Sequence, residues 1–280
     1  MEFWLFLPQS RMSIDDVVGY ARAAEQSGYT GIALIDHLVT PLAEGQDLYE
    51  AMTLATWVAA RTTTLRIGHL VLCDSFRQPS VLAKQAVTLD HASGGRFELG
   101  LGSGSWPREL TGFGVTTATA KERAARLVES VATIRSLWAG ETTGADGLRQ
   151  SPLPLGRLPI LVGGVGPTAL RLAREHADWW NISASHINRL TELREQVTAR
   201  VSAQLMVALD RPGELPGTQL ALAQRRFPTL DYGIVGGSTA QVRDRIAALD
   251  VERVYVWMAP PPSIDQVSAF ANEVISTYVA

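Results

Sequence analysis

Glycine is concentrated at the ends of two short apolar segments, where bare backbone could hold a ligand. The stretch 94–104 contains a glycine pair and then three glycines at alternate positions, which leave the end of a predicted strand without side chains. Such an end can admit a flat molecule. In the stretch 162–167, Gly163, Gly164 and Gly166 precede a proline at a predicted helix start, where free backbone N–H groups attract a phosphate. Both stretches therefore suggest that the chain holds a cofactor.

A further stretch has the same form as 162–167. Gly236 and Gly237 end an apolar run, and Ser238 begins a predicted helix. A lone glycine pair is in most cases a tight turn. Because two such pairs occur late in the chain, phosphate binding and tight turns are left open as equal alternatives.

Side chains able to react are scarce at the ends of the other predicted strands. Asp36 and His37 follow the segment 31–35, yet a histidine after a strand is commonly a structural hydrogen-bonding residue, and an aspartate there can cap a turn. The sequence shows no paired carboxylates, no nucleophilic serine with its base and no spacing of metal ligands. Hydrolysis by acid–base, covalent or metal-assisted chemistry therefore has little support.

The apolar pattern alternates short extended runs with longer amphipathic ones, which is typical of β–α units. The predicted strands cover residues 3–7, 31–35, 65–72, 96–101, 159–162, 178–183, 218–223 and 253–258. The predicted helices cover residues 13–27, 48–60, 79–92, 120–139, 167–175, 190–209, 238–249 and 264–278. Eight units in 280 residues fit a single-domain (β/α)8 TIM barrel, with the seventh unit weakest because 224–235 is irregular. The stretch 141–158 is predicted to be a surface excursion.

Composition and charge narrow the class of protein. Hydrophobic residues make up 46% of the chain, enough for a large core, and the net charge of −3 does not suggest a nucleic-acid partner. The single Cys73 excludes an intrachain disulfide framework, and no cluster of soft ligands indicates zinc. Residues 1–8 are strand-like rather than a signal peptide, and no apolar run is long enough to cross a bilayer. We expect a cytoplasmic protein that acts on a small molecule and binds neither membrane nor nucleic acid.

Several blocks resemble those of the bacterial luciferase-like monooxygenase superfamily, and the likeness runs over nearly the whole chain. Single Gly-x-Gly runs are unspecific, but the order and spacing of these blocks are specific. The blocks are Ile35-Asp36-His37, Phe76-Arg77-Gln78-Pro79, Ala83-Lys84, Thr88-Leu89-Asp90, Ser93 to Gly102, Leu158 to Gly164, and Ala177-Asp178-Trp179-Trp180. The resemblance implies a (β/α)8 barrel that binds a flavin or a deazaflavin, and it is greatest for the branch that uses coenzyme F420.

The resemblance also implies roles for individual residues. Asp36 and His37 would face the reactive edge of the ring, with His37 as the candidate for proton transfer or charge stabilisation during hydride transfer. A non-proline cis peptide, frequent in the family, would lie within Leu70, Val71 and Leu72 and support the central face of the ring. The other cofactor contacts would be Ser103, Gly104 and Ser105 along the ring edge, and Gly163, Gly164 and Gly166 at the phosphate.

Two residues are assigned to a substrate pocket. Trp106 lies in the loop beside the glycines, and Glu109 resembles an acid of many family members, although it could equally serve the start of a helix. Trp179 is expected in the core and Cys73 as a small buried hydrophobe. The remaining histidines, interpreted as structural or exposed and without an evident partner, are His69, His91, His176 and His186.

The substrate does not follow from the resemblance. The glucose-6-phosphate dehydrogenases of the family carry a glutamate directly after their Gly-Thr-Gly, where this chain has Ser105, and the stretch 183–186 lacks a lysine. We therefore predict an F420-dependent oxidoreductase that transfers hydride between the deazaflavin and a small organic substrate, with a homodimer as a reasonable assembly. An FMN-dependent monooxygenase is the first alternative, because the same barrel and glycines would serve it. A non-catalytic flavin-binding or scaffold paralogue is the second. A phosphate-binding barrel isomerase or aldolase is a further alternative, but the absence of an evident catalytic Lys or Glu at the strand ends argues against it.

Overall fold

A computed structural model describes residues 1–41, 45–143, 146–259 and 262–278. The strands are β1 (Glu2–Leu7), β2 (Gly31–Leu34), β3 (Arg66–His69), β4 (Leu72–Cys73), β5 (Leu99–Gly102), β6 (Ile160–Gly163), β7 (Trp179–Ile182), β8 (Arg200–Leu209), β9 (Ile234–Gly237) and β10 (Arg253–Met258). The helices are α1 (Ile14–Gln26), α2 (Ala51–Ala59), α3 (Pro79–Ser93), α4 (Pro107–Gly112), α5 (Ala120–Trp138), α6 (Pro167–Glu175), α7 (Leu190–Arg194), α8 (Thr218–Arg226), α9 (Thr239–Ala247) and α10 (Ile264–Glu273).

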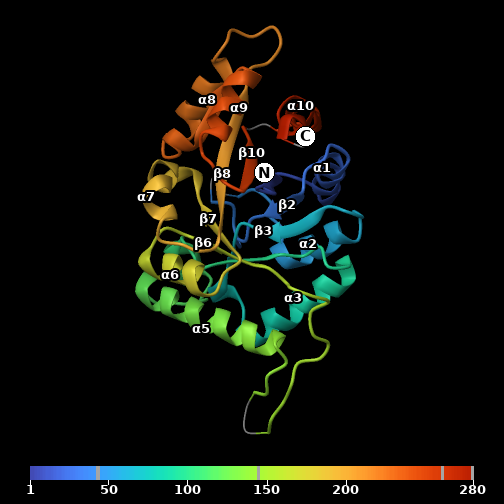
Figure 1. The fold of residues 1–280 in the computed structure, drawn as a ribbon, viewed down its shortest axis with the longest axis vertical. Coiled ribbons are helices and arrows are strands. Elements are labelled where there is room, and N and C mark those ends of the chain that lie inside the picture. Colours follow the sequence, from blue (N-terminus) through green and yellow to red (C-terminus); the bar gives the residue numbers. More distant parts are fainter. Residues whose placement is uncertain (42–44, 144–145, 260–261, 279–280) are drawn as a thin grey trace.

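The strands form a parallel barrel with helices packed around it (Figure 1). Neighbouring strands follow the order β3-β2-β1-β10-β8-β7-β6-β5-β4, and β9 pairs with β8. A parallel bridge between Ile67 in β3 and Phe97 just before β5, together with the pairing of β4 with β5, closes the ring. β3 and β4 thus share one position beside β5, so the barrel has eight positions. The predicted (β/α)8 architecture is confirmed.

The seventh unit is where the sequence prediction is wrong. Only the first residues of the helix predicted over 190–209 are helical, as the short α7, and the rest of that stretch contains the strand β8. The strand predicted over 218–223 is instead part of the helix α8. β8 is buried along most of its length and pairs with β7, β9 and β10. An apolar run with both faces covered loses the alternation that distinguishes a strand from a helix. The stretch 224–235, predicted to be irregular, contains the last turn of α8 and the start of β9.

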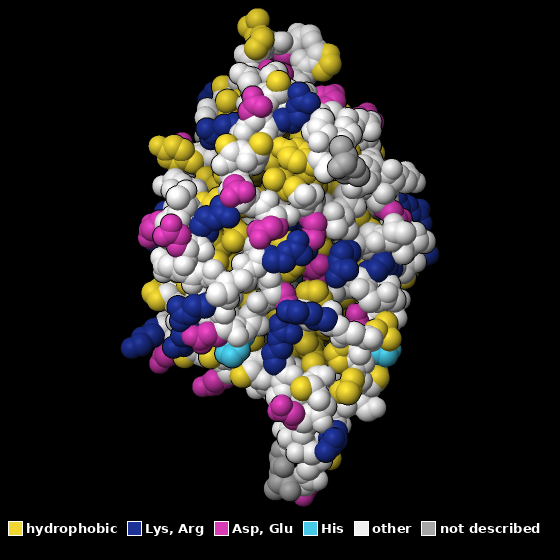
Figure 2. Space-filling model, viewed as in Figure 1, with side chains coloured by type: hydrophobic (Ala, Val, Ile, Leu, Met, Phe, Trp, Pro, Cys, Tyr) yellow, Lys and Arg dark blue, Asp and Glu magenta, His cyan; other side chains and the backbone are white. Residues whose placement is uncertain are grey.

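The strand predicted over 65–72 is divided into β3 and β4, and the helix predicted over 264–278 ends at Glu273 and is followed by a 3₁₀ turn. The remaining predicted elements agree with the structure to within a few residues at their ends. The chain leaves the barrel between α5 and β6 as a long excursion (Figure 1), of which residues 144 and 145 lie outside the described residues. Positive and negative side chains are interspersed over the face in Figure 2. Within the described ranges, no helix is long and apolar enough to cross a bilayer.

Three apolar clusters fill the part of the fold that the structure describes. The largest lies between the strands and the helices around them, and a second lies inside the barrel and includes Trp4, Trp179 and Tyr255. The third includes Met206 of β8 and Ile234 of β9. Trp179 was expected in the core and is only 3% exposed. The expectation for this residue is therefore confirmed.

An ion-pair network seals the barrel at the amino ends of its strands. The guanidinium of Arg253 donates to Glu98 at 2.7 and 3.2 Å and to Glu2 at 2.8 Å. It also lies 3.7 Å from the ring centroid of Trp179 and 4.4 Å from that of Trp4. Arg253 and Glu98 are both buried. A buried charge of this kind persists only when its partners are present.

Glu98→Gln is therefore expected to lower the free energy of unfolding by about 3–5 kcal/mol, because the guanidinium of Arg253 loses its buried counter-charge. Urea unfolding followed by far-UV circular dichroism measures the change. Glu192→Gln is the matched control, since Glu192 pairs with Arg189 on the exposed surface, and no measurable change is expected there. Equal losses in the two variants would contradict this account of the network.

Candidate active site

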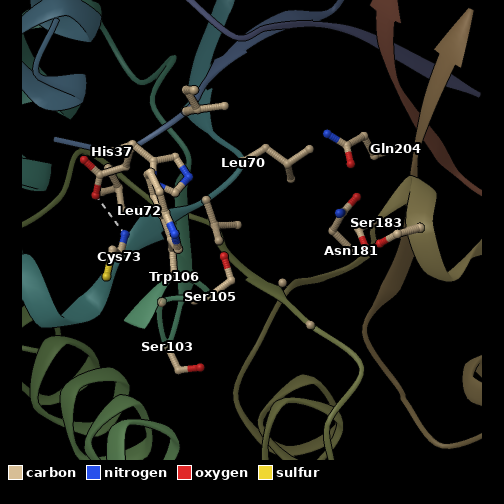
Figure 3. A pocket seen from close by; sticks show the side chains of 18 of the residues that line it. His37, Leu70, Leu72, Cys73, Ser103, Ser105, Trp106, Asn181, Ser183 and Gln204 are labelled. Carbon is tan, nitrogen blue, oxygen red and sulfur yellow. Dashed lines mark hydrogen bonds between the residues drawn. The ribbon is translucent and has the colours of Figure 1, made fainter. Parts of the chain in front are cut away.

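A cavity of about 460 Å³ opens at the carboxyl ends of the barrel strands, within the range of roughly 300–1,000 Å³ typical of small-molecule sites. Every predicted site residue except Gly166 lines it. The predicted residues in its wall are Asp36, His37, Leu70, Val71, Leu72, Ser103, Gly104, Ser105, Trp106, Glu109, Gly163 and Gly164. In Figure 3, His37 and Trp106 lie on one side of this cavity, and Asn181, Ser183 and Gln204 lie on the other.

A bulge between β3 and β4 forms part of the cavity wall. The peptide bond from Leu70 to Val71 is cis, as predicted for this stretch. The side chain of Val71 projects between β5 and β6, so that a β-carbon added at Gly102 would lie 2.6 Å from a Val71 methyl, and one added at Gly163 would lie 3.1 Å away. The glycines at these strand ends therefore make room for the bulge. The sequence prediction gave these glycines the role of exposing backbone to a ligand. In the structure they also let the side chain of Val71 form part of the cavity wall.

His37 is held by a buried carboxylate. Its Nδ1 lies 2.9 Å from Glu109 Oε2, and the other oxygen of Glu109 accepts the backbone N–H groups of Leu38 and Val39 at 2.7 and 3.2 Å. Because a carboxylate can only accept, we assign the shared proton to Nδ1, which makes Nε2 the nitrogen that can exchange a proton with a ligand. The ring of Trp106 packs edge-on at 6.0 Å between centroids.

The sequence prediction placed Glu109 in a substrate pocket. In the structure Glu109 lines the cavity, and its side chain is hydrogen-bonded to His37 and to the backbone after β2. These contacts favour a role for Glu109 in orienting the imidazole of His37.

Asp36 is engaged in the same way. Arg77 donates to its two oxygens at 2.6 and 3.0 Å, and the backbone N–H of Cys73 donates at 2.8 Å. Through these contacts Asp36 ties the end of β2 to β4, and its expected catalytic role stays a prediction. Burial raises the pKa of the neighbouring Cys73 thiol to about 11, so Cys73 stays neutral near pH 7, in agreement with its expected role as a small buried hydrophobe.

The glycine pairs at 163–164 and 236–237 are followed by helices whose amino ends are capped differently. Ser238 and Gln241 close the amino end of α9 with their own side chains. The first helical residue of α6 is a proline, and its N-cap Gly166 makes no side-chain capping bond. The loop before α6 is anchored by Trp180, whose indole N–H donates to Gly164 O at 2.8 Å. The amino end of α6 therefore fits a phosphate better than that of α9, although Gly166 itself stands outside the cavity wall.

Several cavity residues were not predicted. Asn181 and Gln204 are polar side chains in apolar strands, and Asn181 accepts from Ser202 at 3.1 Å. Alternation along β7 could have identified Asn181, but Gln204 was concealed because 190–209 was interpreted as a helix. His186 was expected to lack a partner, yet its Nδ1 lies 3.0 Å from the hydroxyls of Ser183 and Ser185. Arg123, also unpredicted, supports the loop at 103–104 through its carbonyl groups.

The luciferase-like monooxygenase family model matches residues 1–245. The chain belongs to this family. It is 33% identical over 172 residues to an F420-dependent glucose-6-phosphate dehydrogenase of Microbacterium testaceum, covering 59% of this chain and 51% of that protein. It is also 33% identical over 192 residues to an F420-dependent hydroxymycolic acid dehydrogenase of Mycobacterium tuberculosis, covering 65% of this chain and 52% of that protein. The chain thus spans about half the length of these curated relatives.

The same fold occurs in a solved structure. An F420-dependent secondary alcohol dehydrogenase in complex with an F420–acetone adduct superposes with a TM-score of 0.84, at 15% identity and over 98% of each chain. The comparison shows that the two chains share a fold.

Gly102→Ala tests the contact with Val71. The new methyl group would meet Val71, which cannot turn away because it also lies against Gly163, so we expect a loss of about 1–3 kcal/mol in the free energy of unfolding. Urea denaturation gives the value. Gly112→Ala is the control, since nothing lies within 4 Å of its added β-carbon, and it should leave stability unchanged or raise it. Wild-type stability in Gly102→Ala would refute the packing argument.

Proposed function

We propose that the protein is an F420-dependent oxidoreductase that transfers hydride between the deazaflavin and a small organic substrate. The observation that carries this proposal is the convergence, in one cavity, of the Val71 bulge, the carboxylate-held His37 and the loop that leads to the uncapped amino end of α6. The F420-dependent enzymes among its relatives support the same choice of cofactor. A homodimer and a cytoplasmic location remain predictions from the sequence.

The residues of the cavity fit a flat cofactor with a phosphate. The side chains of Leu70, Val71 and Leu72 would support the ring, and Ser103 and Ser105 would lie along its edge. The phosphate would lie at the amino end of α6, where backbone N–H groups and the helix dipole favour negative charge. When bound, the deazaflavin supplies the site that accepts or donates a hydride.

His37 handles the proton that accompanies the hydride. Oxidation of an alcohol removes a hydride from carbon and a proton from the hydroxyl group, and forms a carbonyl. His37 accepts that proton at Nε2, and Glu109 stabilises the resulting imidazolium through Nδ1. In the reverse direction the same nitrogen returns the proton to the carbonyl oxygen. Trp106 packs beside the imidazole and limits the access of water to it.

The choice of cofactor is tested by titrating the purified protein separately with F420 and FMN, using the absorbance and fluorescence of each. We expect F420 to bind with a micromolar or lower dissociation constant and FMN to bind at least tenfold more weakly. Tight binding of FMN alone would replace this proposal with the flavin monooxygenase alternative. Binding of neither would favour a non-catalytic scaffold.

His37→Ala tests the proton-transfer role. F420 affinity should stay within about twofold of wild type, whereas the single-turnover rate with secondary alcohols should fall by about 10²–10⁴-fold, measured as the absorbance change of F420 in stopped flow. Glu109→Gln should lower the rate less and shift its pH profile, because Glu109 acts through His37. His91→Ala, which changes an exposed helix residue, should behave as wild type. An unaltered rate in His37→Ala would remove this residue from the mechanism.

A further inference from the structure

A second cavity of about 490 Å³ adjoins the first near the carboxyl ends of β1 and β10. Ile35, His37 and Gln204 line both cavities. The imidazole of His37 therefore stands where the two spaces meet. A molecule in the second cavity can reach His37 while a cofactor fills the first.

The walls of the second cavity are mainly apolar and aromatic. Trp257 packs edge-on against Phe6 at 5.8 Å and against Phe227 at 5.3 Å between ring centroids. These rings come from β1, β10 and the end of α8, so they are held by separate parts of the barrel. The other apolar residues of the wall are Leu5, Leu7, Pro8, Met12, Ile35, Pro41, Met258, Pro262 and Val267. Such a wall favours an aromatic or long aliphatic group.

Among the described residues of this wall, the acidic and basic side chains other than His37 are Arg11, Asp16 and Arg226. Asp16 is already compensated, because its Oδ2 accepts from the backbone and hydroxyl of Ser13 at the amino end of α1. The guanidinium of Arg226 lies 5.5 Å from the ring centroid of Phe227. Neither arginine has an ion pair or a side-chain hydrogen bond with the part of the chain that the structure describes. The second cavity is thus lined by an apolar wall and by two arginine side chains that could pair with an anionic ligand.

The backbone holds Arg11 at this position. The preceding Gln9 is fully buried, and its side chain exchanges two hydrogen bonds with the backbone of Ile35, at 2.8 and 3.0 Å. Arg11 has a φ of 60°, which is uncommon for a residue other than glycine, and its N–H donates to Asp47 O at 3.2 Å. The loop after β1 is therefore tied to the wall that the two cavities share.

We propose that the second cavity is the substrate compartment and that it selects an apolar, preferably aromatic, alcohol or ketone that carries a carboxylate. This inference rests on the proposed function. The apolar part packs on Phe6, Phe227 and Trp257, and the carboxylate pairs with Arg226 and Arg11. The reacting carbon then lies beside His37, where a bound deazaflavin would supply the hydride acceptor; the hydroxyl proton passes to Nε2 of His37, and the alcohol becomes a carbonyl. Ketone reduction reverses each transfer.

The first test measures binding, so that it does not depend on turnover. The probes are 4-phenylbutyrate and its uncharged amide, titrated by isothermal calorimetry into the protein with and without F420. We expect the carboxylate to bind at least tenfold more tightly than the amide. Arg226→Ala should abolish that preference, whereas Arg225→Ala should keep it, since Arg225 precedes Arg226 in α8 but does not line the cavity. Trp257→Leu should weaken both probes.

Arg11→Gly provides a second variant that is expected to fold, because glycine readily adopts the positive φ of this position. It should also reduce the preference for the carboxylate. None of these variants should change F420 affinity by more than about twofold. Equal binding of the two probes to the wild type, or a parallel loss of F420 affinity in Arg226→Ala, would overturn the substrate assignment. Failure of the wild type to bind F420 would instead overturn the proposed function, so the two failures are distinguishable.

Turnover gives the final comparison. With 4-hydroxy-4-phenylbutyrate as substrate, Arg226→Ala should raise KM at least tenfold and leave kcat nearly unchanged, because it removes binding that is equal in the ground and transition states. With 1-phenylbutan-1-ol, which lacks the carboxylate, the same variant should match wild type. A fall in kcat with unchanged KM would contradict a role for Arg226 in substrate binding.

Discussion

The site depends on how Val71 fits between β5 and β6. Its methyl groups lie 2.6 Å from where Gly102 would carry a β-carbon and 3.1 Å from where Gly163 would, so glycine at the ends of these two neighbouring strands lets the bulge pack closely against them. The bulge in turn separates β3 from β4 and turns the chain toward the cavity. Close packing of this kind tolerates little change in volume. The shape of the first cavity and the closure of the barrel therefore depend on the same side-chain contacts.

The two ends of the barrel use charge differently. At the amino ends, Arg253 and Glu98 are buried and neutralise each other, which seals the interior and leaves no charge for chemistry. At the carboxyl ends, carboxylates are also paired, but their partners lie in the cavity wall: Glu109 orients His37, and Asp36 binds Arg77. Glu109 and Asp36 at this end are therefore engaged with His37 and Arg77 in the wall of the cavity.

The sequence allowed most of the barrel and most of the cavity wall to be predicted, because both depend on local signals. Alternating β–α units and glycine-rich strand ends are visible within short stretches, and the resemblance to a known family supplied Glu109 and the position of the cis peptide. Other features depend on contacts between distant segments. β8 was taken for a helix because both of its faces are covered, and this concealed Gln204. The partners of His186 appear only once the chain turns after β7. The second cavity joins β1, β10 and α8, which no local pattern connects.

The positions of the two cavities also explain why the cofactor was easier to predict than the substrate. The first cavity is lined by strand ends that close the barrel, so some of its residues, such as Gly102 and Gly163, also serve the packing of the strands. The cations of the second cavity stand on the loop after β1 and at the end of α8, outside the ring of barrel strands. Substitutions there alter charge without disturbing strand pairing. Relatives with the same barrel can therefore share a cofactor and differ in substrate, and for this chain the substrate is to be inferred from Arg11, Arg226 and the aromatic wall rather than from the family.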